Sequence, residues 1–144
     1  MTLAEKTLPA DFVVDENLAQ AIRARMREEK LPCAVAFAIA AQQEVSPRRV
    51  GQTADVLQIH LSHCQLGLFG YPAGRKGWEL APSTPLALSD EIQAALHAAV
   101  TESGTLACAQ LWELAAQFRV PKLRIGQLCD ELGIKITPCQ LGAF

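Results

Sequence analysis

The sequence predicts a mainly α-helical protein with a short β-hairpin, built as two tandem modules related by internal duplication. The stretch from Leu31 to Phe69 aligns without a gap with the stretch from Leu106 to Phe144, at a constant offset of 75 residues. Apolar residues recur at helical spacing in both copies. Half of the 144 residues are hydrophobic, which is enough for two small cores. Because two copies are too few to stack as a solenoid, we expect two self-sufficient modules.

The duplicated unit begins near Asp15, because the same offset pairs Asp15-Glu16 with Asp90-Glu91. It ends in a block that both copies share, Cys64-Gln65-Leu66-Gly67 and Cys139-Gln140-Leu141-Gly142. The predicted organisation is an N-terminal arm (1–14), a first module (15–80), a linker (81–88) and a second module (89–144).

The first helix of the first module is predicted from Asp15, because Leu18, Ile22 and Met26 recur every four residues. Two acids stand at its N-terminus, where the helix dipole favours negative charge. Basic residues follow along it, namely Arg23, Arg25, Arg27 and Lys30. They are interpreted as a solvated helix face with Glu28 and Glu29 as partners, with a phosphate-binding patch as the alternative.

Two further helices are predicted, over Cys33 to Gln43 and from Pro47 to about Leu57. Ser46 is a good N-cap, and Pro47 suits a first helical position, where its missing N–H is no loss. The second copy has comparable apolar positions, and Gly133 is placed to end its last helix.

An extended segment follows each third helix, at Ile59 to Leu61 and at Ile134 to Ile136. In the first copy, Leu66 to Tyr71 is predicted to be a strand, with turn residues at 72–77 and a returning strand at Trp78 to Leu80. The second copy ends at Phe144 without such a return, so its hairpin is predicted to be truncated.

Composition limits the possible functions. The net charge is −2; residues 15–69 carry six basic and six acidic residues, and residues 90–144 carry four and six. Neither copy is strongly basic, as a nucleic-acid-binding domain usually is. The longest nearly apolar run, residues 31–41, is too short to cross a bilayer, and residues 1–12 do not show the pattern of a signal peptide, so secretion is not expected. We expect a cytoplasmic protein with reduced cysteines, no membrane partner, no cofactor and no enzymatic activity, because no catalytic constellation is found.

The lines AAQQEVSPRRVGQTADVLQIHL and LAAQFRVPKLRIGQLCDELGIKI resemble the winged helix-turn-helix superfamily of DNA-binding domains. The resemblance covers most of both copies. It implies a transcriptional regulator that binds double-stranded DNA, with the third helix of each module as recognition helix and residues 71–78 as the wing.

The resemblance also implies which residues contact DNA. In the first copy they are Arg48, Arg49, Gln52 and Thr53, with Arg75 and Lys76 on the wing. In the second copy they are Lys122, Arg124 and Gln127. Leu123 and Leu128 stand among these positions, and an apolar patch there favours a protein partner or a homodimer through the second module.

Two features of the sequence leave an alternative function open. In this alternative the protein keeps the fold but binds no nucleic acid, and it acts as a protein-interaction or accessory module. Such a module could be a metal or redox sensor. Cys33, Cys64, Cys108 and Cys139 are repeated thiols that could ligate zinc or an iron–sulfur cluster, although buried packing is preferred because neither copy has a Cys-x-x-Cys clip. Gly51 and Gly126 interrupt the predicted recognition helices and indicate either close packing or close approach to a ligand.

Overall fold

The computed structural model describes residues 12–80 and 90–144, which are mainly helical with two short pairs of strands. The chain divides into two compact units: a first unit of residues 1–64 and 140–144, and a second unit of residues 65–139. This division differs from the predicted modules 15–80 and 89–144. The end of the first repeat, from Gln65 on, belongs to the second unit, and the end of the second repeat, from Gln140 on, belongs to the first unit. The predicted linker 81–88 and most of the predicted arm 1–14 lie outside the described residues.

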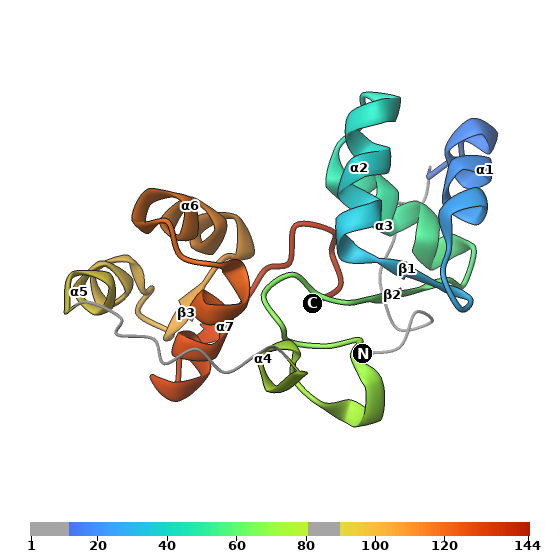
Figure 1. Ribbon diagram of the computed structural model, residues 1–144. Helices are drawn as coiled ribbons and strands as arrows, with labels where there is room; N and C mark the ends of the chain where they lie inside the picture. Colours follow the sequence, from blue (N-terminus) through green and yellow to red (C-terminus); the bar gives the residue numbers. More distant parts are fainter. Residues whose placement is uncertain (1–11, 81–89) are drawn as a thin grey trace. The chain divides into compact units, whose positions relative to one another are not determined.

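In its described residues, the first unit contains three helices and one strand pair, in the order α1 (Glu16–Arg25), β1 (Lys30–Pro32), α2 (Cys33–Gln43), α3 (Pro47–Val56) and β2 (His60–Ser62). Each of the three helices packs against the other two, as Figure 1 shows. Their shared core is fully buried and includes Leu18, Ile22, Leu31, Ile39 and Val50. The predicted starts of these helices are confirmed: Asp15 caps α1 through its carboxylate, and Ser46 caps α3.

The second unit repeats this order with α5 (Asp90–Ala99), β3 (Thr105–Leu106), α6 (Cys108–Phe118), α7 (Lys122–Glu131) and β4 (Lys135–Ile136). It begins with a 3₁₀ turn η2 (Pro72–Gly74) and a short helix α4 (Gly77–Leu80), which packs on α7 (Figure 1). The predicted C-terminal glycine is confirmed, because Gly133 follows α7 with a φ of 72°. The duplication is therefore present in the order of elements as well as in the sequence.

The strands of the two described pairs run parallel, and none of them lies in the hairpin predicted at 66–80. β1 pairs with β2 in the register Lys30 to His60, and β3 pairs with β4 in the register Thr105 to Lys135. Parallel strands need a long crossover, and here the two helices between the strands provide it. The predicted extended segments after α3 and α7 are confirmed as β2 and β4, but their partner strands, which directly precede α2 and α6, were not predicted.

The predicted wing strands at 66–71 and 78–80 are absent from the described residues. Gly67 and Gly70 have φ values of 88° and 82°, a left-handed conformation that interrupts a strand. The loop closes on itself, because the Gly77 N–H donates to the Gly67 carbonyl at 2.8 Å. Residues 77–80 then form α4 instead of a returning strand.

The shared Cys-Gln-Leu-Gly block packs against the glycine of the last helix in each unit. In the first unit, a Cβ on Gly51 would coincide with the carbonyl oxygen of Leu141. In the second unit, a Cβ on Gly126 would coincide with the carbonyl oxygen of Leu66. Each helix therefore receives the block of the other repeat, and the packing interpretation of these two glycines is the one that the structure supports.

Candidate nucleic-acid interface

In the first unit, a turn from Glu44 to Ser46 joins α2 to α3. Glu44 ends α2 with a φ of 55° and a ψ of 41°, and the N–H of Val45 returns to the Ala40 carbonyl at 3.0 Å. The Ser46 hydroxyl accepts the Arg49 N–H at 3.1 Å, which satisfies an open donor at the start of α3. The second unit has the same turn, because Arg119 has a φ of 55° after α6.

Arg48 and Gln52 are the predicted contact residues that α3 presents to solvent. Arg48 is exposed and Gln52 is partly exposed, and they lie four residues apart, which is one helical turn. A guanidinium can bind a phosphate or the O6 and N7 acceptors of guanine, and an amide can pair with adenine. These two side chains can therefore contact one ligand surface together.

Arg49 holds the chain that precedes α1. Its guanidinium donates to the Val13 carbonyl at 2.9 Å and lies 4.7 Å from the centroid of the Phe12 ring. This is a cation–π contact, and with the hydrogen bond it fixes the side chain in place. Phe12 and Val13 fall in a stretch without periodicity, so nothing in the sequence indicated that they contact α3.

Thr53 cannot read a base in this structure, which corrects its predicted role. It is fully buried, and its hydroxyl donates to the Arg49 carbonyl at 2.8 Å within α3. A threonine bonded back to the preceding turn is a common way to satisfy a buried hydroxyl in a helix. Thr53 belongs to the buried side of α3, together with Val50 and Ala54.

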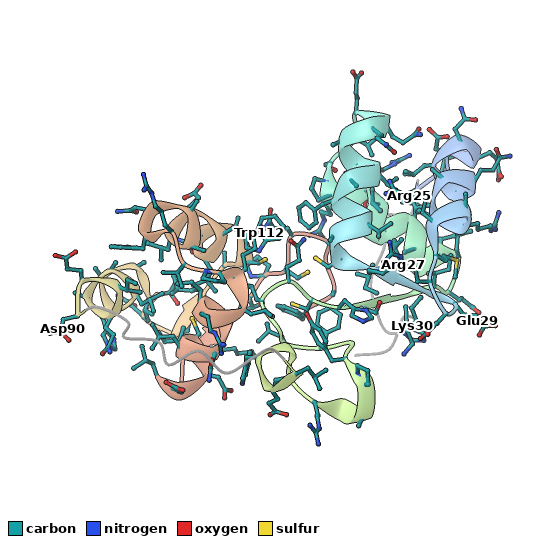
Figure 2. The ribbon with its side chains drawn as sticks, viewed as in Figure 1. Arg25, Arg27, Glu29, Lys30, Asp90 and Trp112 are labelled. Atoms are coloured by element: carbon teal, nitrogen blue, oxygen red, sulfur yellow. The ribbon has the colours of Figure 1, made fainter. Side chains whose placement is uncertain are left out.

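The corresponding cations of the second unit are held by their own unit. Lys122 places its ammonium 4.1 Å from the centroid of the Trp112 ring, which is labelled in Figure 2, and 3.5 Å from the Gln65 amide oxygen. Arg124 is only 8% exposed and donates to the Gln127 amide oxygen at 2.9 Å. The start of α7 is therefore a packed surface.

The two leucines predicted to bind a partner are also used inside the second unit. Leu128 is 4% exposed and belongs to the core. Leu123 is partly buried next to Gly67 and Gly77, where an added Cβ would meet its methyl group at 3.1 Å and 2.8 Å. These leucines do not form the exposed apolar patch that was predicted.

The predicted wing cations belong to the second unit as well, although they were assigned to the first module. Arg75 is exposed, and the Lys76 ammonium donates to the Leu68 carbonyl at 3.0 Å. Lys76 therefore fastens the loop that replaces the wing.

None of the five cysteines forms a disulfide; Cys139 is partly buried and the other four are buried. Burial raises the pKa of the Cys129 thiol from 9.0 to about 11, so this thiol stays protonated. In residues 12–80 and 90–144, no three histidine, cysteine or acidic side chains come together as metal ligands. The repeated cysteines therefore do not form a cluster of three or more metal ligands in these residues. In the same residues, no helix is long and apolar enough to cross a membrane.

No protein-family model matches this chain, and comparisons with curated proteins and with solved structures likewise give no match.

Proposed function

We propose that this protein is a non-enzymatic, cytoplasmic DNA-binding regulator that contacts double-stranded DNA with the start of α3 in the first unit. The observation that carries the proposal is the accessible pair Arg48 and Gln52, one turn apart, directly after the capped turn of a helix-turn-helix. In such motifs the first residues of the second helix contact base edges in the major groove.

Phosphate binding at the start of α3 supports the same proposal. The N-terminus of a helix carries a partial positive charge, which favours an anion there. Arg48 adds a full positive charge on an exposed side chain, and α3 has no acid in its first turn. Arg49 contributes by holding residues 12 and 13 against α3, so the chain before α1 lies beside the proposed interface.

The second unit has a different role in this proposal. Lys122, Arg124 and Leu128 are all engaged in packing at α7. We therefore assign DNA contact to the first unit alone and a supporting or pairing role to the second.

The test is a binding titration of the full chain with a labelled 30-base-pair duplex over a range of salt concentrations. A protein that contacts phosphates loses affinity as salt rises, with a slope of about −0.9 for each phosphate neutralised. Arg48→Gln is expected to flatten that slope by about one phosphate, or to weaken binding by about tenfold if Arg48 reads a base. Arg119→Gln removes the same charge from an exposed position of the second unit and is expected to leave binding unchanged. Salt-independent binding, or equal effects of the two variants, would refute the proposal.

A second candidate is a protein-interaction or accessory module that uses the helix-turn-helix without nucleic acid. It is favoured by the buried Thr53 and the engaged Arg49, which leave only two of the four predicted α3 contacts accessible. A complete absence of duplex binding at low salt would favour this candidate. Zinc and iron analysis of protein purified without oxygen then tests its metal-sensor form, and less than one metal per chain would exclude that form.

A further inference from the structure

The first unit contains an open pocket of about 610 Å³ beside the start of α2. Its apolar lining comes from the strand β1 and the first turns of α2, with Pro32, Ala34, Val35 and Ala38. Its polar lining comes from the end of α1, the turn that follows, and the residue after β2, with Arg25, Arg27, Glu28 and His63. Small-molecule sites are typically pockets of roughly 300 to 1,000 Å³ with an apolar lining and a few convergent polar groups, and this pocket falls in that range.

The charge of the pocket is positive, because two guanidinium groups face one carboxylate. Arg25 donates to the neutral amide oxygen of Gln42 at 3.3 Å, which orients the guanidinium without neutralising it. Within the described residues, neither Arg25 nor Arg27 has a carboxylate oxygen within 4.0 Å of its nitrogens. Figure 2 labels both arginines, together with Glu29 and Lys30 on the turn that follows α1.

The backbone of that turn places the charged groups at the pocket. α1 ends at Arg25, and Glu28 and Glu29 have φ values of 51° and 66°, so the chain reverses in a left-handed conformation. Hydrogen bonds between Arg27 and Lys30 close the turn at 2.8 Å and 3.0 Å. The helical partner positions predicted for Glu28 and Glu29 therefore do not exist, which leaves the arginines available to an external anion.

The second repeat provides a comparison within the same chain. The counterparts of Arg25, Arg27 and His63 at the offset of 75 are Val100, Glu102 and Pro138. The counterpart of Ala38 is Glu113. The packing elements of the repeat are common to both copies, whereas the basic groups and the apolar side chains at positions 35 and 38 occur only in the first. These pocket residues are therefore not needed to build the repeat.

We propose that this pocket binds a small organic anion, with the anionic group at Arg25 and Arg27 and an apolar body against Val35 and Ala38. The guanidinium groups supply charge-assisted hydrogen bonds to a carboxylate, phosphate or sulfonate. The floor of α2 buries the apolar body, and Glu28 opposes a second negative charge nearby. The site is separate from Arg48 and Gln52, so the proposal does not depend on DNA binding.

The test uses 1-anilinonaphthalene-8-sulfonate, a fluorescent probe with one sulfonate on an aromatic body, titrated into the folded full chain. We expect saturable binding of one probe per chain, and weaker binding by at least tenfold for the uncharged analogue N-phenyl-1-naphthylamine. Arg25→Gln and Arg27→Gln are each expected to weaken sulfonate binding by about tenfold, the effect of one lost charge-assisted hydrogen bond. The uncharged analogue is expected to change by less than twofold.

Two variants complete the experiment. Arg23→Gln removes the same charge from an exposed position of α1 that does not line the pocket, and it is expected to leave probe binding unchanged. Ala38→Glu introduces the carboxylate of the second repeat at a partly exposed position and is expected to abolish sulfonate binding. Competition by decanoate and by decyl phosphate then distinguishes a carboxylate from a phosphate as the preferred group. The proposal is overturned if the sulfonate probe does not bind, if Arg23→Gln weakens it as much as Arg25→Gln, if Ala38→Glu leaves it unchanged, or if neither competitor displaces it.

Discussion

Replacing Gly51 with alanine is expected to destabilise the first unit, although the same change in an ordinary helix is stabilising. Gly51 lies in the middle of α3, where alanine normally gains about 0.5–1 kcal/mol of helix stability. Here the added Cβ would coincide with the carbonyl oxygen of Leu141. The C-terminal segment 140–144 must therefore shift or leave before the methyl group fits.

The magnitude follows from what the segment contributes. Leu141 is 1% exposed, and burying a leucine side chain contributes about 1.5–3 kcal/mol relative to leaving it in water. Undocking the segment relieves the clash, so the loss of this burial sets the scale of the cost. Subtracting the helix gain leaves a net destabilisation of about 0.5–2.5 kcal/mol.

The assay is a double-mutant cycle measured by urea unfolding with far-ultraviolet circular dichroism, using the full chain and a chain that ends at Cys139. In the truncated chain the obstacle is gone, so Gly51→Ala is expected to stabilise by about 0.5–1 kcal/mol. Gln52→Ala is the control on the same helix, because consecutive helical residues point about 100° apart around the axis, and its effect is expected to be the same in both chains. The reasoning is refuted if Gly51→Ala has the same sign and size in the two chains.

Two predictions concern the cysteines. Cys139 is the only one of the five cysteines that is not buried. We expect a disulfide reagent at pH 8 to label one thiol quickly in the folded protein, and Cys139→Ser to remove that fast phase; a fast phase that persists in the variant would contradict the assignment. Burial raises the pKa of Cys129 to about 11 in the folded state, against 9.0 for an ordinary thiol, so the unfolded chain loses this proton first as the pH rises. The contribution of Cys129 to stability is therefore complete below about pH 9 and is lost as the pH rises through about 11. Cys129→Ala, which copies Ala54 of the first repeat, is expected to make the fall in stability between pH 9 and 11 shallower, and an unchanged slope in urea unfolding would show that Cys129 does not cause the fall.

Local signals in the sequence were sufficient to place the starts of α1 and α3 and the end of α7. The first turn of a helix has backbone N–H groups without a partner in the helix. Asp15 and Ser46 mark helix starts because their side-chain oxygens accept from such groups within three residues, and Pro47 marks one because it has no N–H. Gly133 marks a helix end for a similar reason. Such signals act over a few residues, so they can be read without knowing the tertiary structure.

The orientation of α3 and the pairing of strands could not be predicted in the same way. Thr53 is a reasonable surface residue by type, and only packing puts it on the buried side of the helix. The predicted wing failed because alternating apolar residues at 66–71 indicate a strand, whereas Gly67 and Gly70 adopt positive φ. Arg48 and Gln52 lie at accessible positions of α3 and stay predicted contact residues. The contacts of Arg49 with Phe12 and Val13 could not be predicted, because they join parts of the chain more than 35 residues apart.

The exchanged Cys-Gln-Leu-Gly block explains why the duplication is needed for each unit to be complete. Gly51 lies 90 residues before Leu141, and Gly126 lies 60 residues after Leu66, so neither repeat contains the segment that covers its own glycine in this structure. Leu66 and Leu141 are both almost fully buried, so each unit would expose apolar surface without the block from the other repeat. The same contact between the repeated glycine and the repeated block is therefore formed twice, each time between the two repeats. Because a single repeat would leave both halves without their partners, the two copies depend on each other for stability even where their surfaces, such as the Arg25 pocket, have diverged.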